Sequence, residues 1–282
     1  MRTLSTRMWL LLLLCALAGM AGCCIEIGCD FPPAKYTRVV EVSAPLAAGG
    51  CFTAKTHNGS IMVAGADVAE CRVTATIVAR AGSEERAKKL TEQTTVRLEA
   101  DGNKLKTRID TPRTSMNQSV SVSLDATVPN QSSLELSTHN GAVKIVDIEG
   151  KVSATTLNGG ITASSVHGGS RLRTSNGSIT CKEASGDMQL RSHNGNICAA
   201  YAESASPVCD VSIVTHNGGI DFTGPPDFSA AVEVSTHNGS IRTDLPITVL
   251  GRVSRRKLMG TIGTGEGELN LETHNGSIKI RS

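Results

Sequence analysis

The sequence predicts an all-β protein of the β-solenoid type, and both its internal spacing and its composition indicate this. Asn-Gly occurs eight times, and four successive copies begin 18 residues apart, at 140, 158, 176 and 194. A fixed spacing of this length is typical of proteins in which each repeat forms one structural unit. The chain has 28 Gly but only one Trp, two Tyr and four Phe. This composition favours short strands around a thin aliphatic core.

Each repeat carries apolar residues at alternate positions on both sides of the Asn-Gly pair. Counted from Asn, position +3 is Ile or Val, position −4 is aliphatic and position −2 is Thr or Ser. This alternation is the period of a strand with one buried face, so each unit is predicted as strand, Asn-Gly corner, strand and Gly corner. Asn suits such a corner because it tolerates positive φ and can stack in a ladder. The predicted corners are Asn58, Asn140, Asn158, Asn176, Asn194, Asn217, Asn238 and Asn275.

Two architectures fit this unit. Asn-Gly is a strong signal for a type I′ hairpin, which would give an antiparallel meander. Identical residues at equivalent positions favour the solenoid, because stacked coils place Ile on Ile and Asn on Asn at a spacing of about 4.8 Å. The 37-residue interval between Asn238 and Asn275 is interpreted as two coils, with Met259-Gly260-Thr261-Ile262 as a degenerate corner.

Residues 63–128 break the rhythm and are predicted to form an insertion that caps the N-terminal side of the stack. Alternating patterns predict longer strands at 71–80, 95–100, 104–110 and 119–128. One short helix is expected over 83–90, with Ser83 as its N-cap. Such a cap would protect a sheet edge that could otherwise template aggregation.

The N-terminus has the pattern of a secretory signal. Arg2 and Arg7 precede and flank the start of an apolar run from Trp9 to Leu17, which is too short to span a bilayer comfortably. Met20-Ala21-Gly22-Cys23 resembles the lipobox of bacterial lipoproteins, although Met replaces the usual aliphatic residue. We expect Cys23 to be acylated and to anchor the chain to a lipid bilayer. By resemblance to lipoprotein sorting, the lack of Asp after Cys23 implies the outer membrane, facing the periplasm or the surface.

These boundaries divide the chain into four predicted regions. They are a signal peptide (1–22), a lipidated linker (23–35), an N-terminal coil with its capping insertion (36–130) and the regular repeats (131–282).

Cysteine and histidine supply the candidates for further chemistry. Outside the cytoplasm disulfides can form, and we predict that Cys51 pairs with Cys71 and Cys198 with Cys209. Six of the seven His directly precede the corner Asn, where strand alternation points them outward. Stacked coils would place His193, His216 and His237 about 5 Å apart, as a candidate metal-binding set. The alternative is a polar residue multiplied by repeat duplication.

The chain resembles a family of bacterial envelope proteins known as putative adhesins, whose domain has no assigned function. The resemblance rests on NGSI at 58–61, the insertion with its helix, Val-Pro-Asn at 128–130, the 18-residue units and THNGSIKI at 273–280. It implies a right-handed β-solenoid and supplies no catalytic residues.

These observations predict a non-enzymatic envelope lipoprotein whose solenoid presents a binding face to an envelope polymer or protein. One alternative is a structural or stress-sensing component that acts through a protein partner. Another is a polysaccharide-active enzyme, but Asp and Glu are scattered over different repeat positions instead of forming a pair. A net charge of +2 gives no case for nucleic acid, and no cofactor is expected.

Overall fold

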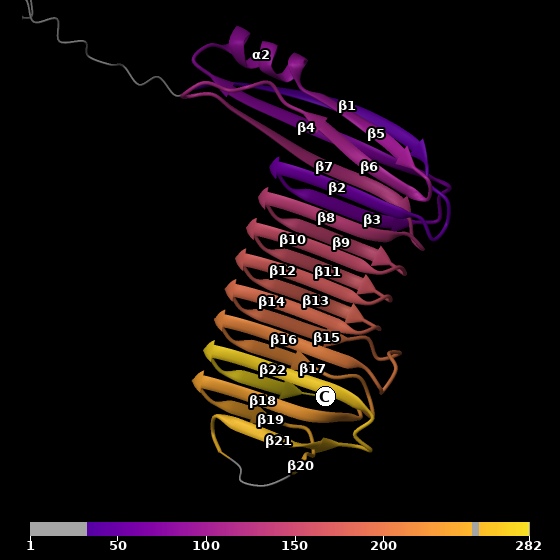
Figure 1. Ribbon diagram of the computed structural model, residues 1–282, viewed down its shortest axis with the longest axis vertical. Coiled ribbons are helices and arrows are strands. Elements are labelled where there is room, and N and C mark those ends of the chain that lie inside the picture. Colours follow the sequence, from indigo (N-terminus) through magenta and orange to yellow (C-terminus); the bar gives the residue numbers. More distant parts are fainter. Residues whose placement is uncertain (1–32, 250–253, 282) are drawn as a thin grey trace, which may run out of the picture. The chain divides into compact units, whose positions relative to one another are not determined.

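The computed structural model describes residues 33–249 and 254–281, and these form a stack of β-coils (Figure 1). The predicted signal peptide and Cys23 lie outside the described residues. Within the described part, no helix is long and apolar enough to cross a membrane.

Each coil contributes one strand to each of two sheets, which we call sheet A and sheet B; they have 11 and 12 strands among the described residues. The sheet B strands of the coils are β2 (Cys51–Asn58), β8 (Ser133–Asn140), β10 (Val152–Asn158), β12 (Ser170–Asn176), β14 (Met188–Asn194), β16 (Asp210–Asn217), β18 (Ala230–Asn238) and β22 (Gly267–Asn275). The sheet A strands that follow them are β3 (Ile61–Ala66), β9 (Val143–Ile148), β11 (Ile161–Val166), β13 (Ile179–Ala184), β15 (Ile197–Tyr201), β17 (Ile220–Thr223), β19 (Ile241–Thr243) and β23 (Ile278–Arg281).

Neighbouring coils are parallel and in register. Asn158 lies opposite Asn140 on one side and Asn176 on the other. In sheet A, Ile161 pairs in the same way with Val143 and Ile179. The solenoid prediction is therefore confirmed, and the meander is excluded because its strands would be antiparallel.

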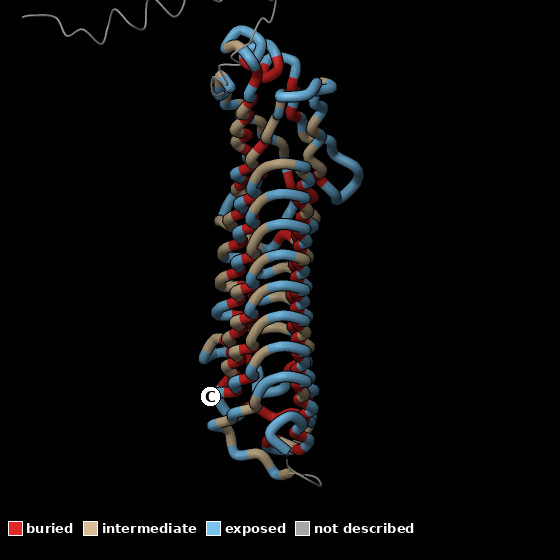
Figure 2. The backbone as a smooth tube through the Cα atoms, turned by 90° about the vertical axis from the view of Figure 1, so that its left-hand side faces the viewer, coloured by how far each residue is buried: buried red, intermediate tan, exposed pale blue. Residues whose placement is uncertain are grey.

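The core fills the space between the two sheets, where the aliphatic positions of every coil meet. Figure 2 shows buried residues along the inside of the stack, with exposed residues at the corners. The +3 side chains Ile61, Ile161, Ile179 and Ile278 are each at most 1% exposed. Burial of each such side chain contributes roughly 1.5–3 kcal/mol, so stability accumulates from coil to coil.

The N-terminal end of the stack is covered by longer, mainly antiparallel strands and by the helix, as the fold prediction required. In sheet A these strands are β1 (Ala34–Pro45), β4 (Glu70–Ala81) and β7 (Ser119–Pro129), and in sheet B they are β5 (Thr95–Asp101) and β6 (Lys104–Asp110). Helix α2 (Glu84–Gln93) begins after Ser83, whose hydroxyl accepts a hydrogen bond from the Arg86 N–H. Ala87 and Leu90 of this helix pack against Ala79 and Ala81 of β4.

The C-terminal end departs from the sequence prediction. The order of strands in sheet B is β16, β22, β18 and then β21 (Lys257–Ile262), so the last coil of the chain lies between two earlier ones. Met259 and Gly260 do not form a corner, because they lie within β21, which pairs antiparallel with β18. The interpretation of the 37-residue interval as two coils is wrong. Met259 stands where a corner Asn was expected, and β20 (Thr248–Val249) pairs antiparallel with β21 at this end of sheet B.

Glycine is required at the Asn-Gly corner because consecutive corners touch. A Cβ built on Gly195 would collide with the carbonyl oxygen of Gly177, and the equivalent collision recurs at the other corners except Gly59, where the carbonyl oxygen of Val122 in β7 takes its place. Gly169, in the opposite corner, has only the Asp187 carbonyl oxygen nearby, at 3.8 Å. Steric contact with the neighbouring strand therefore requires glycine at the corner, and a positive φ adds to this requirement at Gly59, Gly159 and Gly177.

Substitution of Gly195 by Ala should lower the free energy of unfolding by about 2–3 kcal/mol, because the corner must separate to admit the methyl group. The matched control, Gly169→Ala, adds the same methyl group at ordinary contact distance and should change the free energy by less than about 1 kcal/mol. Urea denaturation followed by circular dichroism measures both. Equal losses would show that coil contact is not the reason for the glycine.

Candidate functional site

The corner asparagines form a continuous ladder of amide hydrogen bonds along the stack. Each side-chain Nδ2 except that of Asn58 donates to the Oδ1 of the adjacent coil, at 2.7 to 2.9 Å. In spatial order the ladder runs through Asn58, Asn140, Asn158, Asn176, Asn194, Asn217, Asn275 and Asn238. All but Asn58 are exposed, and the ladder uses one N–H donor and one oxygen lone pair of each inner side chain.

Two further hydrogen bonds fix every corner except the one at Asn238, which has only the second of them. The Gly159 N–H donates to the Asn176 carbonyl at 2.9 Å, and the equivalent bond recurs along the stack. The buried hydroxyl at position −2 donates to the Gly carbonyl of the preceding coil, as Thr156 does to Gly141 at 3.0 Å. The role of the corner is therefore structural, since its hydrogen bonds join neighbouring coils.

The ladder was predicted correctly, but the role given to positive φ was wrong. Of the described non-glycine residues, those with positive φ include Asp147, Ser165 and Glu183, which lie one residue before the ends of the sheet A strands β9, β11 and β13, and none of the ladder Asn residues. Asn is selected by its side-chain amide.

The outer face of sheet B carries a group of arginines that sequence reasoning did not single out. Arg171 and Arg173 lie on β12 and Arg191 on β14, and all three are exposed. Arg173 and Arg191 are register partners, and Arg171 Nε donates to Gln189 Oε1 at 3.1 Å. None of the three arginines forms an ion pair with any of the described residues. The sequence could have predicted this cluster, since Arg173 and Arg191 share position −3 of neighbouring repeats. The net charge of +2 for the whole chain does not indicate such a local group of positive charges.

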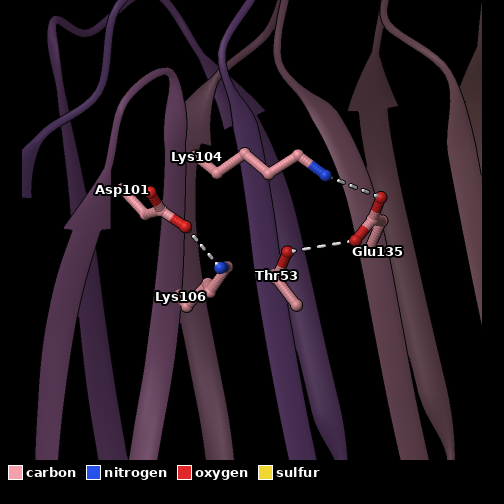
Figure 3. A network of polar contacts seen from close by, with 5 residues as sticks. All are labelled: Thr53, Asp101, Lys104, Lys106 and Glu135. Carbon is pink, nitrogen blue, oxygen red and sulfur yellow. Dashed lines mark hydrogen bonds and ion pairs between the residues drawn. The ribbon is translucent and has the colours of Figure 1, made fainter.

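Charges on the same face near the cap are, in contrast, neutralised in pairs. Figure 3 shows Lys104 and Thr53 both reaching Glu135, at 3.5 and 3.3 Å, while Lys106 contacts Asp101 at 2.8 Å. The hydrogen bond and charge of Lys106 lower the pKa of Asp101. These contacts tie β5, β6, β2 and β8 together across their outer surface.

Comparison with protein families assigns the fold. The family model described as Toastrack DUF4097 matches residues 38–281, which is nearly the whole solenoid and its cap. The chain belongs to the Toastrack DUF4097 family. This assignment confirms the resemblance found in the sequence.

The solved structures that are similar to this chain are distant from it in sequence. A putative cell adhesion protein from Clostridium sporogenes is 12% identical with a TM-score of 0.39, over 86% of this chain and 99% of that one. A putative adhesin from Bacteroides fragilis is also 12% identical, with a TM-score of 0.41 over 86% and 97%. A putative lipid binding protein from Parabacteroides distasonis is 11% identical, with a TM-score of 0.27 over 86% and 97%. Comparison with curated proteins gave no match.

The outward histidines of this Toastrack chain form two separate columns. His57 stacks on His139 with ring centroids 4.8 Å apart. The longer column is His193, His216, His274 and His237, with centroids 5.0, 4.7 and 4.6 Å apart. The expected adjacency of His216 and His237 is wrong, because the inserted C-terminal coil places His274 between them.

These columns do not have the geometry of a metal site. The rings of His193 and His216 are parallel within 2°, and those of His274 and His237 within 4°. A metal ion lies in the ring plane of each imidazole that binds it, so two parallel stacked rings cannot share one ion unless a ring rotates. Among the described residues, no group of three or more His, Cys, Asp or Glu could hold a metal.

The predicted disulfides are absent from the structure. Cys51, Cys71, Cys198 and Cys209 are free thiols, as is Cys181. Cys51 lies in β2 of sheet B and Cys71 faces the core from β4 of sheet A, so the two belong to different sheets. Cys209 is buried in the loop before β16, with Sγ 3.0 Å from the Ser206 carbonyl oxygen, whereas Cys198 is half-buried on the outside of β15.

Burial raises the pKa of Cys181 to about 12, which predicts a loss of stability in alkaline solution. The unfolded thiol ionises near its ordinary pKa while the folded thiol stays protonated, so its stabilising effect is complete below about pH 8.5 and is lost as pH rises toward 12. Cys181→Ala should reduce the fall in unfolding free energy between pH 8 and pH 10.5, measured by urea denaturation. Ala is a matched replacement because Ala163 and Ala199 hold the equivalent positions on either side. An unchanged pH dependence would contradict the assignment.

Proposed function

We propose that this protein is a non-enzymatic envelope lipoprotein that binds an anionic envelope polymer on the outer face of sheet B. The observation that carries the proposal is the arginine cluster of Arg171, Arg173 and Arg191. Guanidinium groups bind carboxylate and phosphate through paired hydrogen bonds, which makes such a polymer a suitable partner.

The arginine cluster lowers the stability of the sheet unless it binds an anion. Arg173 and Arg191 are directly opposite each other, and like charges in that position destabilise strand pairing by roughly 0.2–1 kcal/mol. Paired contacts of the kind seen at Glu135 would relieve this repulsion, but the cluster has none among the described residues. A shallow groove of about 140 Å³ runs between the two arginines and Gln189, Ser212 and Val214.

The surroundings define which part of the face would bind. A larger groove of about 440 Å³ lies on the β10 side, and its charged lining is mixed, with Lys151 and Arg171 beside Glu135 and Asp187. Farther along the stack the outward side chains become acidic, with Glu272 on β22 and Glu233 on β18. The proposed site therefore covers the coils from β10 to β14, which suits a short anionic segment of a longer chain.

The fold supports a binding role more than a catalytic one. Coil stacking holds the outer side chains at the fixed spacing of strands in a sheet, about 4.8 Å, so the face is rigid before any ligand arrives. Pre-organisation of this kind lowers the entropic cost of binding.

The double variant Arg173→Gln/Arg191→Gln should weaken binding to solubilised peptidoglycan and to a polyuronate by about tenfold or more, because two charge-assisted contacts are lost. The matched control is Lys144→Gln/Arg242→Gln, which removes the same charge from exposed positions on sheet A. Surface-bound polymer in a biosensor measures both at low and physiological salt. Equal weakening by the two variants, or no binding by the unaltered protein, would refute the arginine site.

The proposed envelope attachment is tested separately. Replacement of Cys23 by Ala removes the thiol that would carry the acyl chains, so the protein should move from the membrane fraction to the soluble fraction and lose labelling by a palmitate analogue. Cys24→Ala is the matched control and should stay membrane-bound. Continued labelling of the Cys23 variant would show that attachment does not use this residue.

A further inference from the structure

Three corners of the chain have the same six-residue sequence. Thr-His-Asn-Gly-Ser-Ile occurs at 56–61, 236–241 and 273–278. Asn-Gly is chemically labile, because the Gly nitrogen can attack the neighbouring side-chain amide with little steric hindrance. Identical neighbours give the three copies the same intrinsic reactivity, so any difference between them in the folded protein arises from their places in the stack.

The folded structure protects two of the three copies. The Gly59 N–H donates to the Asn140 carbonyl at 2.9 Å, and the Gly276 N–H donates to the Asn238 carbonyl at 3.1 Å. Seven of the eight corner glycines are held by a bond of this kind. A nitrogen that donates such a bond can neither lose its proton readily nor turn toward the side chain. Gly239 is the exception, because its N–H has no acceptor among the described residues.

The corner at Asn238 is also looser in three other respects. Gly239 is exposed, whereas the other corner glycines are only partly exposed. Ile241 is half-buried, while every other +3 side chain is buried. Within the described part of the chain, Asn238 Oδ1 receives no hydrogen bond, although its Nδ2 donates to Asn275 at 2.8 Å.

The C-terminal cap forms hydrogen bonds on both sides of this corner but none with Gly239. The Arg255 carbonyl accepts from the Ile241 N–H at 3.0 Å, and the Arg256 carbonyl accepts from the Thr236 N–H at 2.9 Å. These bonds replace those that a further coil would make at positions +3 and −2. They do not extend to Gly239, which lies between the two bonded positions.

We propose that Asn238 is a site of spontaneous covalent modification, by deamidation through a succinimide. The Gly239 nitrogen loses its proton to solvent base and attacks Cγ of Asn238. The new C–N bond closes a five-membered ring, and the side-chain nitrogen leaves as ammonia. Water then opens the ring at either carbonyl, which leaves an aspartyl residue or its isoaspartyl isomer at this position. No oxidant, enzyme or cofactor is needed.

The product alters the end of the ladder. A carboxylate cannot donate, so the hydrogen bond to Asn275 Oδ1 is lost and two acceptors face each other. The isoaspartyl form also adds a methylene to the main chain, which shifts β19 out of register with β23. The modification would therefore loosen the last coil in the stack while leaving the earlier coils intact.

The test is to incubate the full folded chain at mildly alkaline pH and to follow each Asn-Gly site by peptide mapping. Deamidation adds about 1 Da to a fragment, and backbone fragmentation distinguishes aspartyl from isoaspartyl products. A parallel sample in denaturant gives the rate for each site without structure. The ratio of the unfolded to the folded rate should be smaller at Asn238 than at Asn58 or Asn275 by at least about tenfold, since opening is easiest at a frayed end.

The two sites with identical neighbours are the internal controls. Equal protection at the three sites, or stronger protection at Asn238, would overturn the proposal. The variant Asn238→Gln, which would have to close a less favourable six-membered ring, should abolish the early product and leave the rates at Asn58 and Asn275 unchanged. Persistence of that product in the variant would assign it to another residue.

Discussion

The hydrogen bonding between successive Asn-Gly corners is the interaction on which the rest of the structure depends. At the inner corners an amide, a backbone N–H and a buried hydroxyl all bond to the neighbouring coil, as at Asn158, Gly159 and Thr156. The bonds fix both register and spacing, so the aliphatic side chains meet in the same order in every coil. Because every coil presents the same donors and acceptors, each coil stabilises only its neighbours, and the ends of the stack need separate solutions.

The same uniformity explains why the order of coils in space differs from their order in the chain. Asn217 and Asn238 offer the same contacts, so the coil containing Asn275 fits between them as well as at the end. The segment before it has no Asn and cannot extend the ladder, and it folds back as β20 and β21. This places His274 within the longer histidine column and leaves Gly239 at the terminal corner.

A rigid core of this kind leaves the outward positions free to vary. Near the cap, charges such as Lys104 and Glu135 pair and join strands. On β12 and β14 the arginines remain unpaired with any described residue, which gives that part of sheet B a different chemistry from its surroundings. The candidate binding face and the reactive corner at Asn238 thus both occur where polar groups lack the ion pairs or hydrogen bonds that their equivalents make elsewhere in the stack.

The sequence by itself determined the coil, since alternation and an 18-residue period depend on local geometry that repeats with each unit. It also predicted helix α2 and the cap strands β4, β5, β6 and β7, because Ser83 and the long alternating runs are local signals, but it did not predict β1. Only the tertiary structure decided the position of the last coil, the free thiols and the arginine cluster. These features depend on which segments lie side by side, and coils with interchangeable contacts do not encode that order in their own pattern.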